Sequence, residues 1–253
     1  MKRAATIETT GEATLREAAM NQPMLSVRDL SVHFRGPALE TPVRAVDGVS
    51  FELCAGEAMA IVGETGSGKT TLGRALLGLH PPGTTRGSIR LCGQELAALS
   101  EDGWRPIRWR RIAMAVQGAG NAFDPVYRLG EQIAEPLRTH LGYSSEQAME
   151  RAAALAARVG LQPQHLRAYP HQVSGGEKQR AMLAMALTCQ PEVLIVDEPT
   201  SGQDVLSRAR LIALLREIRR ESGLALILIT HDLAAAAQLA ERVAVLYAGK
   251  LVE

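Results

Sequence analysis

The sequence predicts an α/β fold with a mostly parallel β-sheet covered by helices on both faces. Three observations predict it. Short apolar runs suited to buried strands alternate with longer segments of helical periodicity. One such run, residues 58–62, leads into the glycine-rich segment 63–71, and a helix is expected directly afterwards, over residues 70–79. The length of 253 residues also accommodates one large domain with an inserted subdomain.

An antiparallel β patch is expected ahead of this sheet. Residues 1–23 lack a sustained apolar stripe, so we interpret them as a mobile extension and residues 24–253 as the folded domain. Apolar residues recur irregularly over 25–34 and predict a broken β segment. Residues 49–54 alternate between apolar and polar side chains, which is typical of a half-buried strand.

A helical insertion is expected in the middle of the chain. Short strands are predicted over residues 88–91 and 112–116, and the second ends at Gln117. Helical patterning then predominates, with Ser144 and Gln147 spaced as a capping box. We therefore interpret residues 118–173 as an inserted helical subdomain.

The alternation of strands and helices resumes after the insertion. The expected elements are a helix over 177–189, a strand over 193–196, a helix over 205–221 capped by Asp204, a strand over 224–229, a helix after His231 and a strand over 243–247. Repeated βα units of this kind place their strands in a parallel sheet with both faces covered.

Residues 63–71 read Gly-Glu-Thr-Gly-Ser-Gly-Lys-Thr-Thr and fit the phosphate-binding pattern G-x-x-x-x-G-K-S/T. The glycines allow successive backbone N–H groups to surround a phosphate, the lysine adds a positive charge, and the first threonine supplies a hydroxyl for Mg²⁺. The segment therefore predicts a P-loop NTPase core. The expected nucleotide-binding residues are Gly63, Glu64, Gly66, Ser67, Gly68, Lys69, Thr70 and Thr71. A chance glycine-rich turn is the alternative, and the flanking strand and helix disfavour it.

Two adjacent carboxylates, Asp197 and Glu198, end the apolar run that begins at residue 193. Two acids at the end of a buried strand are costly unless a cation meets them. Mg²⁺ shared with Thr70 and the phosphates would do so, with Asp197 as its ligand. Glu198 would then polarise a water molecule against the terminal phosphate. The alternative is that the carboxylates only cap the next helix.

Composition excludes several other classes. The net charge of +1 provides no general attraction to nucleic acid or anionic lipid. The three cysteines are widely spaced and odd in number, which favours neither a disulfide framework nor a zinc site and fits a reducing cytosol. No apolar run approaches the roughly 18 residues of a membrane span. The chain is expected to be soluble, with any membrane role exerted through a partner.

A cluster of arginines and tryptophans occupies residues 104–111. It admits two interpretations, a nucleic-acid patch or a solvated face beside a strand. We favour the solvated face, because the charge balance of the remaining chain is neutral.

Ser174, Gly175, Gly176 and Glu177 lead into a helix and form a second anion-binding N-terminus. One nucleotide cannot easily use two such sites in one chain. With the phosphate loop and the paired carboxylates in this order, residues 24–253 resemble the ATP-binding subunit of an ATP-binding cassette (ABC) transporter.

The resemblance implies a role for each motif. Residues 63–70 match the Walker A loop, residues 193–197 the Walker B strand, residues 174–177 the signature motif and residues 201–204 the D-loop. The implied catalytic residues are Glu198, His231 and Gln117, the implied metal ligands are Thr70, Gln117 and Asp197, the implied adenine-stacking residue is Phe34, and Asp204 ends the D-loop.

The family pattern implies that two cassettes face each other head to tail. Ser174 and Gly176 of one chain would then close on the γ-phosphate held by Lys69 of the other. Two motifs depart from the commonest form: the signature reads Val-Ser-Gly-Gly-Glu instead of beginning with Leu and ending with Gln, and the D-loop reads Ser-Gly-Gln-Asp instead of Ser-Ala-Leu-Asp. We expect closure to be retained and communication through the D-loop to be retuned.

A narrower resemblance, to the peptide and nickel importer branch, is carried by residues 117–125, 169–174 and 247–253. Members of that branch usually continue past this point through a helical tail, so a shortened or an incomplete member is expected. The implied function is that of an ATP-hydrolysing, energy-coupling subunit of an importer for peptides, nickel or a metal chelate, with ATP and Mg²⁺ as cofactors.

The implied partners are two membrane-spanning permease subunits, a second ABC ATPase or a second copy of this chain, and, indirectly, an extracytoplasmic solute-binding protein. The implied location is the cytoplasmic face of the inner membrane, as a peripheral subunit, and no nucleic acid is expected. The alternatives are a soluble ABC ATPase acting on nucleic acid or ribosomes, and a regulatory cassette that binds ATP without hydrolysis. The sequence lacks the long coiled coil or second cassette typical of the first, and Glu198 and His231 disfavour the second.

Overall fold

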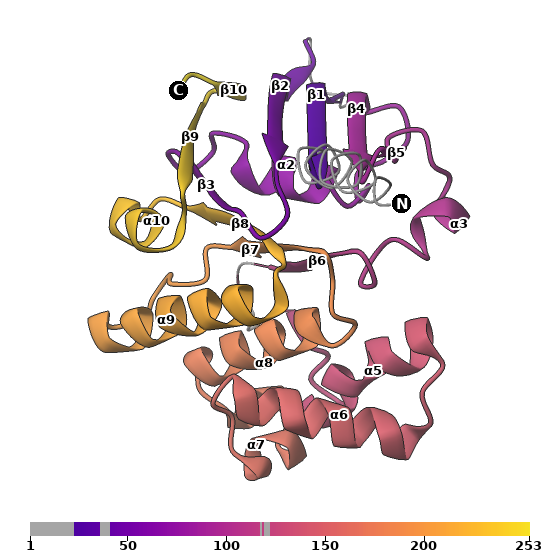
Figure 1. Cartoon of the computed structure of the whole chain (residues 1–253), viewed down its shortest axis with the longest axis vertical. Helices are drawn as coiled ribbons and strands as arrows, with labels where there is room; N and C mark the ends of the chain where they lie inside the picture. The colour runs from indigo at the N-terminus through magenta and orange to yellow at the C-terminus, as the bar shows by residue number, and fades with distance from the viewer. Residues whose placement is uncertain (1–22, 36–40, 117, 119–121) are drawn as a thin grey trace, which may run out of the picture.

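The computed structural model describes residues 23–35, 41–116, 118 and 122–253 (Figure 1). The expected mobile extension therefore lies almost wholly outside the described residues, and so does Gln117. The elements are, in chain order, β1 (Leu25–Phe34), β2 (Val43–Leu53), β3 (Ala58–Val62), α2 (Lys69–Ala75), β4 (Thr85–Leu91), β5 (Gln94–Glu95), α3 (Glu101–Trp104), β6 (Ile112–Ala115), α5 (Leu129–Leu141), α6 (Ser145–Arg158), α7 (Pro163–Arg167), the 3-10 helix η1 (Pro170–Gln172), α8 (Gly175–Leu187), β7 (Val193–Asp197), α9 (Val205–Ser222), β8 (Ala225–Thr230), α10 (Leu233–Leu239), β9 (Arg242–Tyr247) and β10 (Lys250–Leu251).

The strands form two sheets. One is four-stranded and antiparallel, in the order β2-β1-β4-β5, and the other is six-stranded, in the order β10-β9-β3-β8-β7-β6. In the second sheet β9, β3, β8, β7 and β6 are parallel and only β10 runs antiparallel. The predicted α/β class, with a mostly parallel sheet and an antiparallel β patch, is confirmed.

The register of the parallel sheet brings three strand ends together. Val62 at the end of β3 is paired with Thr230 at the end of β8, and Asp197 at the end of β7 is paired with Ile229. Ligands of open α/β sheets bind beyond the carboxyl ends of the strands. The phosphate loop and the paired carboxylates therefore meet at one edge of the sheet.

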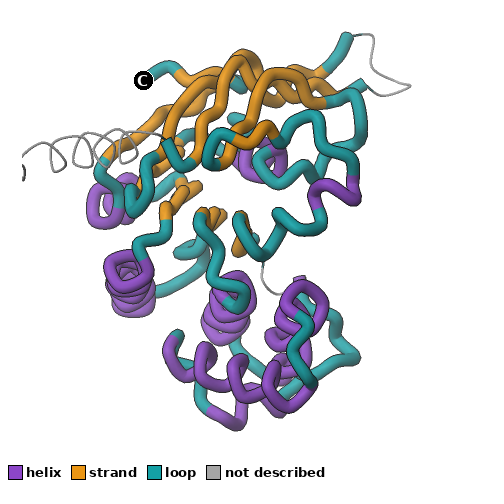
Figure 2. The backbone as a smooth tube through the Cα atoms, turned by 45° about the vertical axis from the view of Figure 1, so that its right-hand side comes forward, coloured by secondary structure: helices purple, strands orange, loops and turns teal. Residues whose placement is uncertain are grey.

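Both faces of the parallel sheet are buried, so its strands carry apolar residues on both sides. In β3, Ala58, Ala60 and Val62 belong to a core shared with helices α5, α6, α8, α9 and α10. Met59 and Ile61 belong to a second core, shared with α2 and the antiparallel sheet. Figure 2 shows the helices of residues 129–187 gathered at the end of the molecule away from the antiparallel sheet.

Several predicted helix ends are confirmed. The Ser144 hydroxyl accepts a hydrogen bond from Gln147 N, and Ser144 N donates to the Gln147 side chain, which completes the capping box at the start of α6. Asp204 caps α9 by accepting from the backbone N–H groups of Leu206 and Ser207. These local polar signals set helix boundaries without help from the tertiary structure.

Other element bounds differ from the prediction. The helix after the phosphate loop ends at Ala75, before the expected residue 79, because the chain turns at Gly78, against which the Trp104 ring packs. The second strand begins at Val43, well before residue 49, and pairs irregularly with β1. The short helix α3, capped by Ser100, was not predicted. No helix in the described part of the chain is long and apolar enough to cross a bilayer.

Candidate active site

The phosphate loop is held between two backbone segments that are distant in the sequence. A Cβ atom at Gly63 would lie 2.2 Å from the carbonyl oxygen of Leu246, and one at Gly68 would lie 2.1 Å from that of Ala45. Gly68 also has a φ of 105°, which other residues rarely adopt. These two positions therefore accept only glycine, and the loop is fixed between β2 and β9.

The turn between β9 and β10 closes the loop from the other side. Gly249 N donates to the carbonyl oxygen of Ser67 at 2.9 Å, and the Gly249 carbonyl accepts from Asp47 N at 2.8 Å. A cleft of about 360 Å³ opens here, lined by Val43, Arg44, Ala45, Thr65, Gly66, Gly68, Lys69, Thr70, Thr71, Glu198, Ala248 and Gly249. The sequence did not identify the residues of β2 and of this turn as part of the site.

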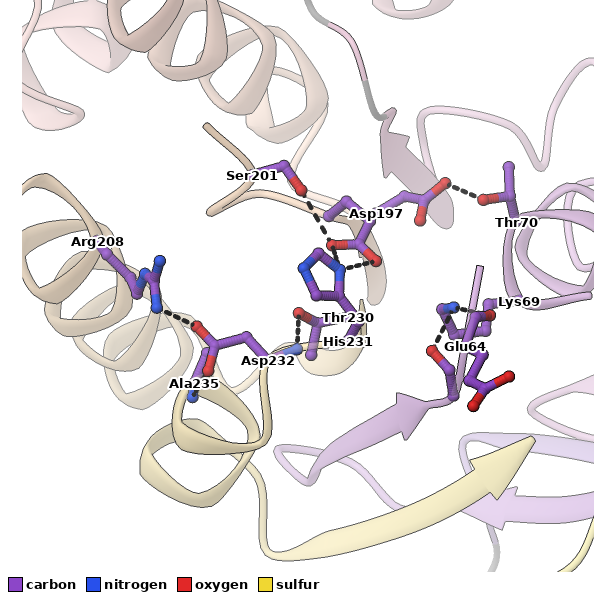
Figure 3. A network of polar contacts seen from close by, with 12 residues as sticks. Glu64, Lys69, Thr70, Asp197, Ser201, Arg208, Thr230, His231, Asp232 and Ala235 are labelled. Atoms are coloured by element: carbon purple, nitrogen blue, oxygen red, sulfur yellow. Dashed lines mark hydrogen bonds and ion pairs between the residues drawn. The ribbon is translucent and has the colours of Figure 1, made fainter. Parts of the chain in front are cut away.

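Lys69 is folded back over its own loop. Its Nζ donates to the carbonyl oxygens of Gly63 at 2.7 Å and Glu64 at 2.8 Å, and the residue is buried (Figure 3). The ammonium group is therefore held against the loop that is expected to receive a phosphate.

Thr70 and Asp197 meet across the sheet edge. The Thr70 hydroxyl donates to Asp197 Oδ2 at 2.8 Å. Asp197 is completely buried, and its Oδ1 has no hydrogen-bond partner among the described residues. Burial raises the pKa of the Asp197 carboxyl, and the neighbouring Glu198 raises it further, whereas the hydrogen bond from Thr70 lowers it. A hydroxyl and a carboxylate with a free buried oxygen are hard donors, and they fit Mg²⁺.

The Glu198 carboxylate is held from two sides. His231 Nδ1 lies 2.8 Å from it, and the Ser201 hydroxyl donates to it at 3.1 Å (Figure 3). The backbone of Glu198 has a φ of 49°, which is uncommon outside glycine and marks many functional positions. Glu198 N donates to Ile229 O, so this conformation is tied to β8. These contacts hold the buried Glu198 carboxylate at the cleft beside the phosphate loop.

The N-terminus of α8 is capped within the chain. The Ser174 hydroxyl accepts from Glu177 N, and Ser174 N donates to the Glu177 carboxylate, which lowers the pKa of Glu177. A Cβ at Gly175 or Gly176 would meet no atom within 4 Å among the described residues, so the space beside them is open. None of the residues lining the cleft comes from α8. A single chain therefore does not place this helix end on its own phosphate loop.

Comparisons with known proteins agree with this geometry. A protein-family model described as ABC transporter matches residues 46–201. The chain belongs to the ABC transporter family. It is 41% identical over 234 residues to the dipeptide transport ATP-binding protein DppD of Haemophilus influenzae, covering 91% of this chain and 70% of the relative. It is 42% identical over 237 residues to DppD of Bacillus subtilis, covering 92% and 70%.

Solved structures of ABC cassettes have the same fold. The dimeric structure of MJ0796, a bacterial ABC transporter cassette, superposes with a TM-score of 0.82 at 26% identity and covers 91% of this chain and 97% of that chain. The post-hydrolysis state of that cassette, bound to ADP and Pi, gives the same values. The predicted ABC cassette fold, the ATPase class and the function as an ATP-hydrolysing transporter subunit are thus confirmed.

Phe34 and Gln117 are the remaining nucleotide-site residues that the ABC motifs imply. Phe34, which is expected to stack on adenine, lies at the end of β1 and is paired with Val43, a residue that lines the cleft. Its ring packs edge-on against the His80 ring, with the two ring centroids 5.4 Å apart. His80 in turn lies 2.9 Å from the Thr71 carbonyl. Gln117 lies outside the described residues, so its expected role stays a prediction.

The basic cluster is only partly a solvated face. Arg108 is paired with Glu101, donates to the carbonyls of residues 77 and 78, and lies over the Trp104 ring. Arg111 is paired with Glu192, which precedes β7. The interpretation of this cluster as a solvated face is therefore wrong for two of its arginines, because their partners fold against them. Arg105 and Arg110 are exposed.

Proposed function

We propose that this chain energises the import of peptides. The relatives reported above are named for dipeptide transport, and a further relative of similar identity is a putative peptide import ATP-binding protein of Brucella melitensis. These names favour peptides over nickel or a metal chelate, the other solutes that the sequence left open. On this proposal residues 24–253 form the ABC domain, with residues 118–173 as its helical subdomain.

The proposed site binds ATP with its phosphates on the loop that includes Gly63, Gly66, Ser67 and Gly68, and Lys69 neutralises them. The backbone N–H groups and the N-terminus of α2 add a positive field at the same place. Glu64 and Thr71 complete the set of loop residues, and Phe34 stacks on the adenine. The pairing of Phe34 with Val43, which lines the cleft, supports this assignment.

Thr70 and Asp197, with Gln117, are the proposed holders of Mg²⁺, which would neutralise charge on the phosphates. The orphaned Asp197 oxygen supports this proposal. Glu198 orients the attacking water and receives its proton. Ser201 and His231 fix the orientation of that carboxylate, as their contacts with it suggest.

The working unit is proposed to contain two cassettes, this chain with a second ABC ATPase or with its own copy. Ser174, Gly175, Gly176 and Glu177 of one chain would face the phosphate loop of the other, and Asp204 would end the D-loop between them. The open space beside the two glycines supports this arrangement. Two permease subunits would hold the pair at the cytoplasmic face of the membrane, and a solute-binding protein would deliver the peptide to them. No nucleic acid partner is proposed.

The observation that carries the catalytic assignment is the Glu198 carboxylate held between Ser201 and His231. Glu198→Gln preserves the shape of the side chain but removes its basicity. It should lower ATP turnover at least about a hundredfold while ATP still binds, since general bases contribute about 10²–10⁴ to the rate. The control is Glu192→Gln, a carboxylate paired with Arg111 and absent from the cleft. Sustained hydrolysis by Glu198→Gln would refute the assignment.

The importer proposal is tested by purifying the tagged chain from detergent-solubilised membranes of its own cell. Two multi-span subunits and a second cassette protein should co-purify and be identified by mass spectrometry. Peptide addition, together with the solute-binding protein, should then stimulate ATP hydrolysis by the reconstituted complex. Recovery of ribosomal or DNA-bound proteins alone would refute the transport assignment.

A further inference from the structure

An ion pair joins the helix that follows the D-loop to the helix that follows His231. Arg208 lies in the first turn of α9, where its backbone N–H donates to the Asp204 carbonyl at 3.0 Å. Its Nη1 donates to Asp232 Oδ2 at 2.7 Å (Figure 3). The pair therefore connects the segment ending in Asp204 to the residue directly after His231.

Asp232 is held in place by several contacts besides this one. Its Oδ1 accepts from the backbone N–H groups of Ala234 at 3.0 Å and Ala235 at 3.1 Å, which caps α10. Its own N–H donates to the hydroxyl of Thr230, a completely buried residue at the end of β8, at 3.0 Å. The backbone on both sides of His231 is thus anchored, at residue 230 by the sheet and at residue 232 by α9 and α10.

The ion pair is partly shielded from solvent. The Asp232 side chain is 14% exposed and the Arg208 side chain is 40% exposed. Arg208 Nε is buried and has no hydrogen-bond partner among the described residues. Removing part of a guanidinium from water without a partner is unfavourable, so stability alone does not explain this geometry.

The His231 ring depends on its backbone for orientation. Its side chain is 62% exposed, although its Nδ1 lies 2.8 Å from the Glu198 carboxylate. A side chain with so little packing around it is oriented mainly by the backbone that carries it and by that one contact. Small displacements of residue 232 would therefore move the ring.

We propose that Arg208 is a positioning residue for ATP hydrolysis. Through Asp232 it fixes the backbone at His231, so that the imidazole stays against Glu198, and it makes this segment move together with the D-loop. The inference rests on the proposed catalytic roles of Glu198 and His231. It adds to them a connection within one chain between the D-loop and the switch histidine.

Arg208→Met tests the inference. Arg208 does not line the cleft, so the KM for ATP should change less than about twofold while kcat falls about tenfold, as expected when orientation but not substrate binding is lost. Arg208→Lys keeps the charge and should recover most of kcat. Arg210→Met is the matched control, because Arg210 is an exposed arginine of the same helix that makes no ion pair among the described residues.

Asp232→Asn provides an independent route, since asparagine is also a good helix N-cap but removes the charge that Arg208 meets. It should lower kcat as much as Arg208→Met, and the double variant should lose no more than either single one. Asp232→Asn alone therefore tests the inference, even if a thermal melt shows that Arg208→Met is poorly folded. Wild-type kcat in Asp232→Asn would overturn the inference.

Combination with His231→Ala separates the inference from the proposed function. If Arg208 acts through His231, Arg208→Met should cost nothing further in the His231→Ala background. The inference would be overturned if Arg208→Met lowered kcat a further tenfold in the His231→Ala background. It would also be overturned if His231→Ala were impaired while Arg208→Met was fully active. Either result would leave the proposed function standing. Wild-type hydrolysis by His231→Ala would instead refute the catalytic role of the histidine, and with it the inference.

Discussion

Asp197→Asn should stabilise the nucleotide-free protein while removing its response to Mg²⁺ and ATP. The wild-type carboxylate is completely buried, and one of its oxygens lacks a partner among the described residues. A buried polar atom without a partner costs about 1–3 kcal/mol, and more when it is charged. Asparagine keeps a polar atom at this position but removes its charge, and relief of about 1–2 kcal/mol corresponds to a rise in Tm of about 2–8 °C in a protein of this size.

The pH dependence of this effect follows from the raised pKa of Asp197, which has burial as its main cause. Because the folded state binds a proton on this group more readily than the unfolded state does, the penalty is present at neutral pH. It begins to shrink as the pH falls below the raised pKa and is gone below the ordinary pKa of the unfolded chain. The Tm advantage of Asp197→Asn over the wild type should therefore shrink on acidification.

Thermal denaturation with and without Mg²⁺ and ATP measures both effects. Glu198→Gln is the control, because the Glu198 carboxylate has partners in Ser201 and His231 and its replacement should bring no gain in Tm. In the wild type the ligands should raise Tm, as they bind only the folded state. The reasoning is wrong if Asp197→Asn melts below the wild type without nucleotide, or if Mg²⁺ and ATP raise the Tm of both equally.

Two further predictions concern the phosphate loop. Lys69→Ala should weaken ATP binding at least about tenfold, since it removes a charge-assisted contact with phosphate, and a titration with a fluorescent ATP analogue that showed unchanged affinity would contradict this. Gly68→Ala should lower the free energy of unfolding by about 2–4 kcal/mol, because it combines a strained φ with the contact against the Ala45 carbonyl. The control is Gly175→Ala, which has open space for its methyl group and should change the free energy of unfolding by less than about 1 kcal/mol in denaturant titrations. Equal losses of stability in Gly68→Ala and Gly175→Ala would refute the role of the close contact.

The sequence predicted the parts of the site that depend on local pattern and on the ends of parallel strands. The apolar run ending at Asp197 and the run ending before Gly63 each predicted a buried strand, and parallel pairing then required Asp197 and Thr70 to converge. The caps at Ser144 and Asp204 were predictable for the same reason, since each uses residues within one helical turn.

The remaining features depend on contacts between residues far apart in the chain. The contact of Gly68 with the Ala45 carbonyl and the pairing of Arg111 with Glu192 have no local signal. The same holds for Arg208, whose partner Asp232 lies on another helix. Hydrophobic periodicity specifies which face of an element is buried but not which distant polar group meets it.

The closure of the phosphate loop by the turn at Gly249 has a consequence for biosynthesis. The loop comes before its neighbouring strands β8 and β9 and the turn that contacts Ser67, which lie about 150 or more residues later in the chain, within residues 225–251. A ribosome would therefore have exposed the whole glycine-rich segment long before the segment 242–251 emerges to enclose it. Because such long-range pairing forms late, we expect nascent chains to acquire nucleotide only after residues 242–251 have left the ribosome, too late for cellular ATP to guide the earlier folding steps.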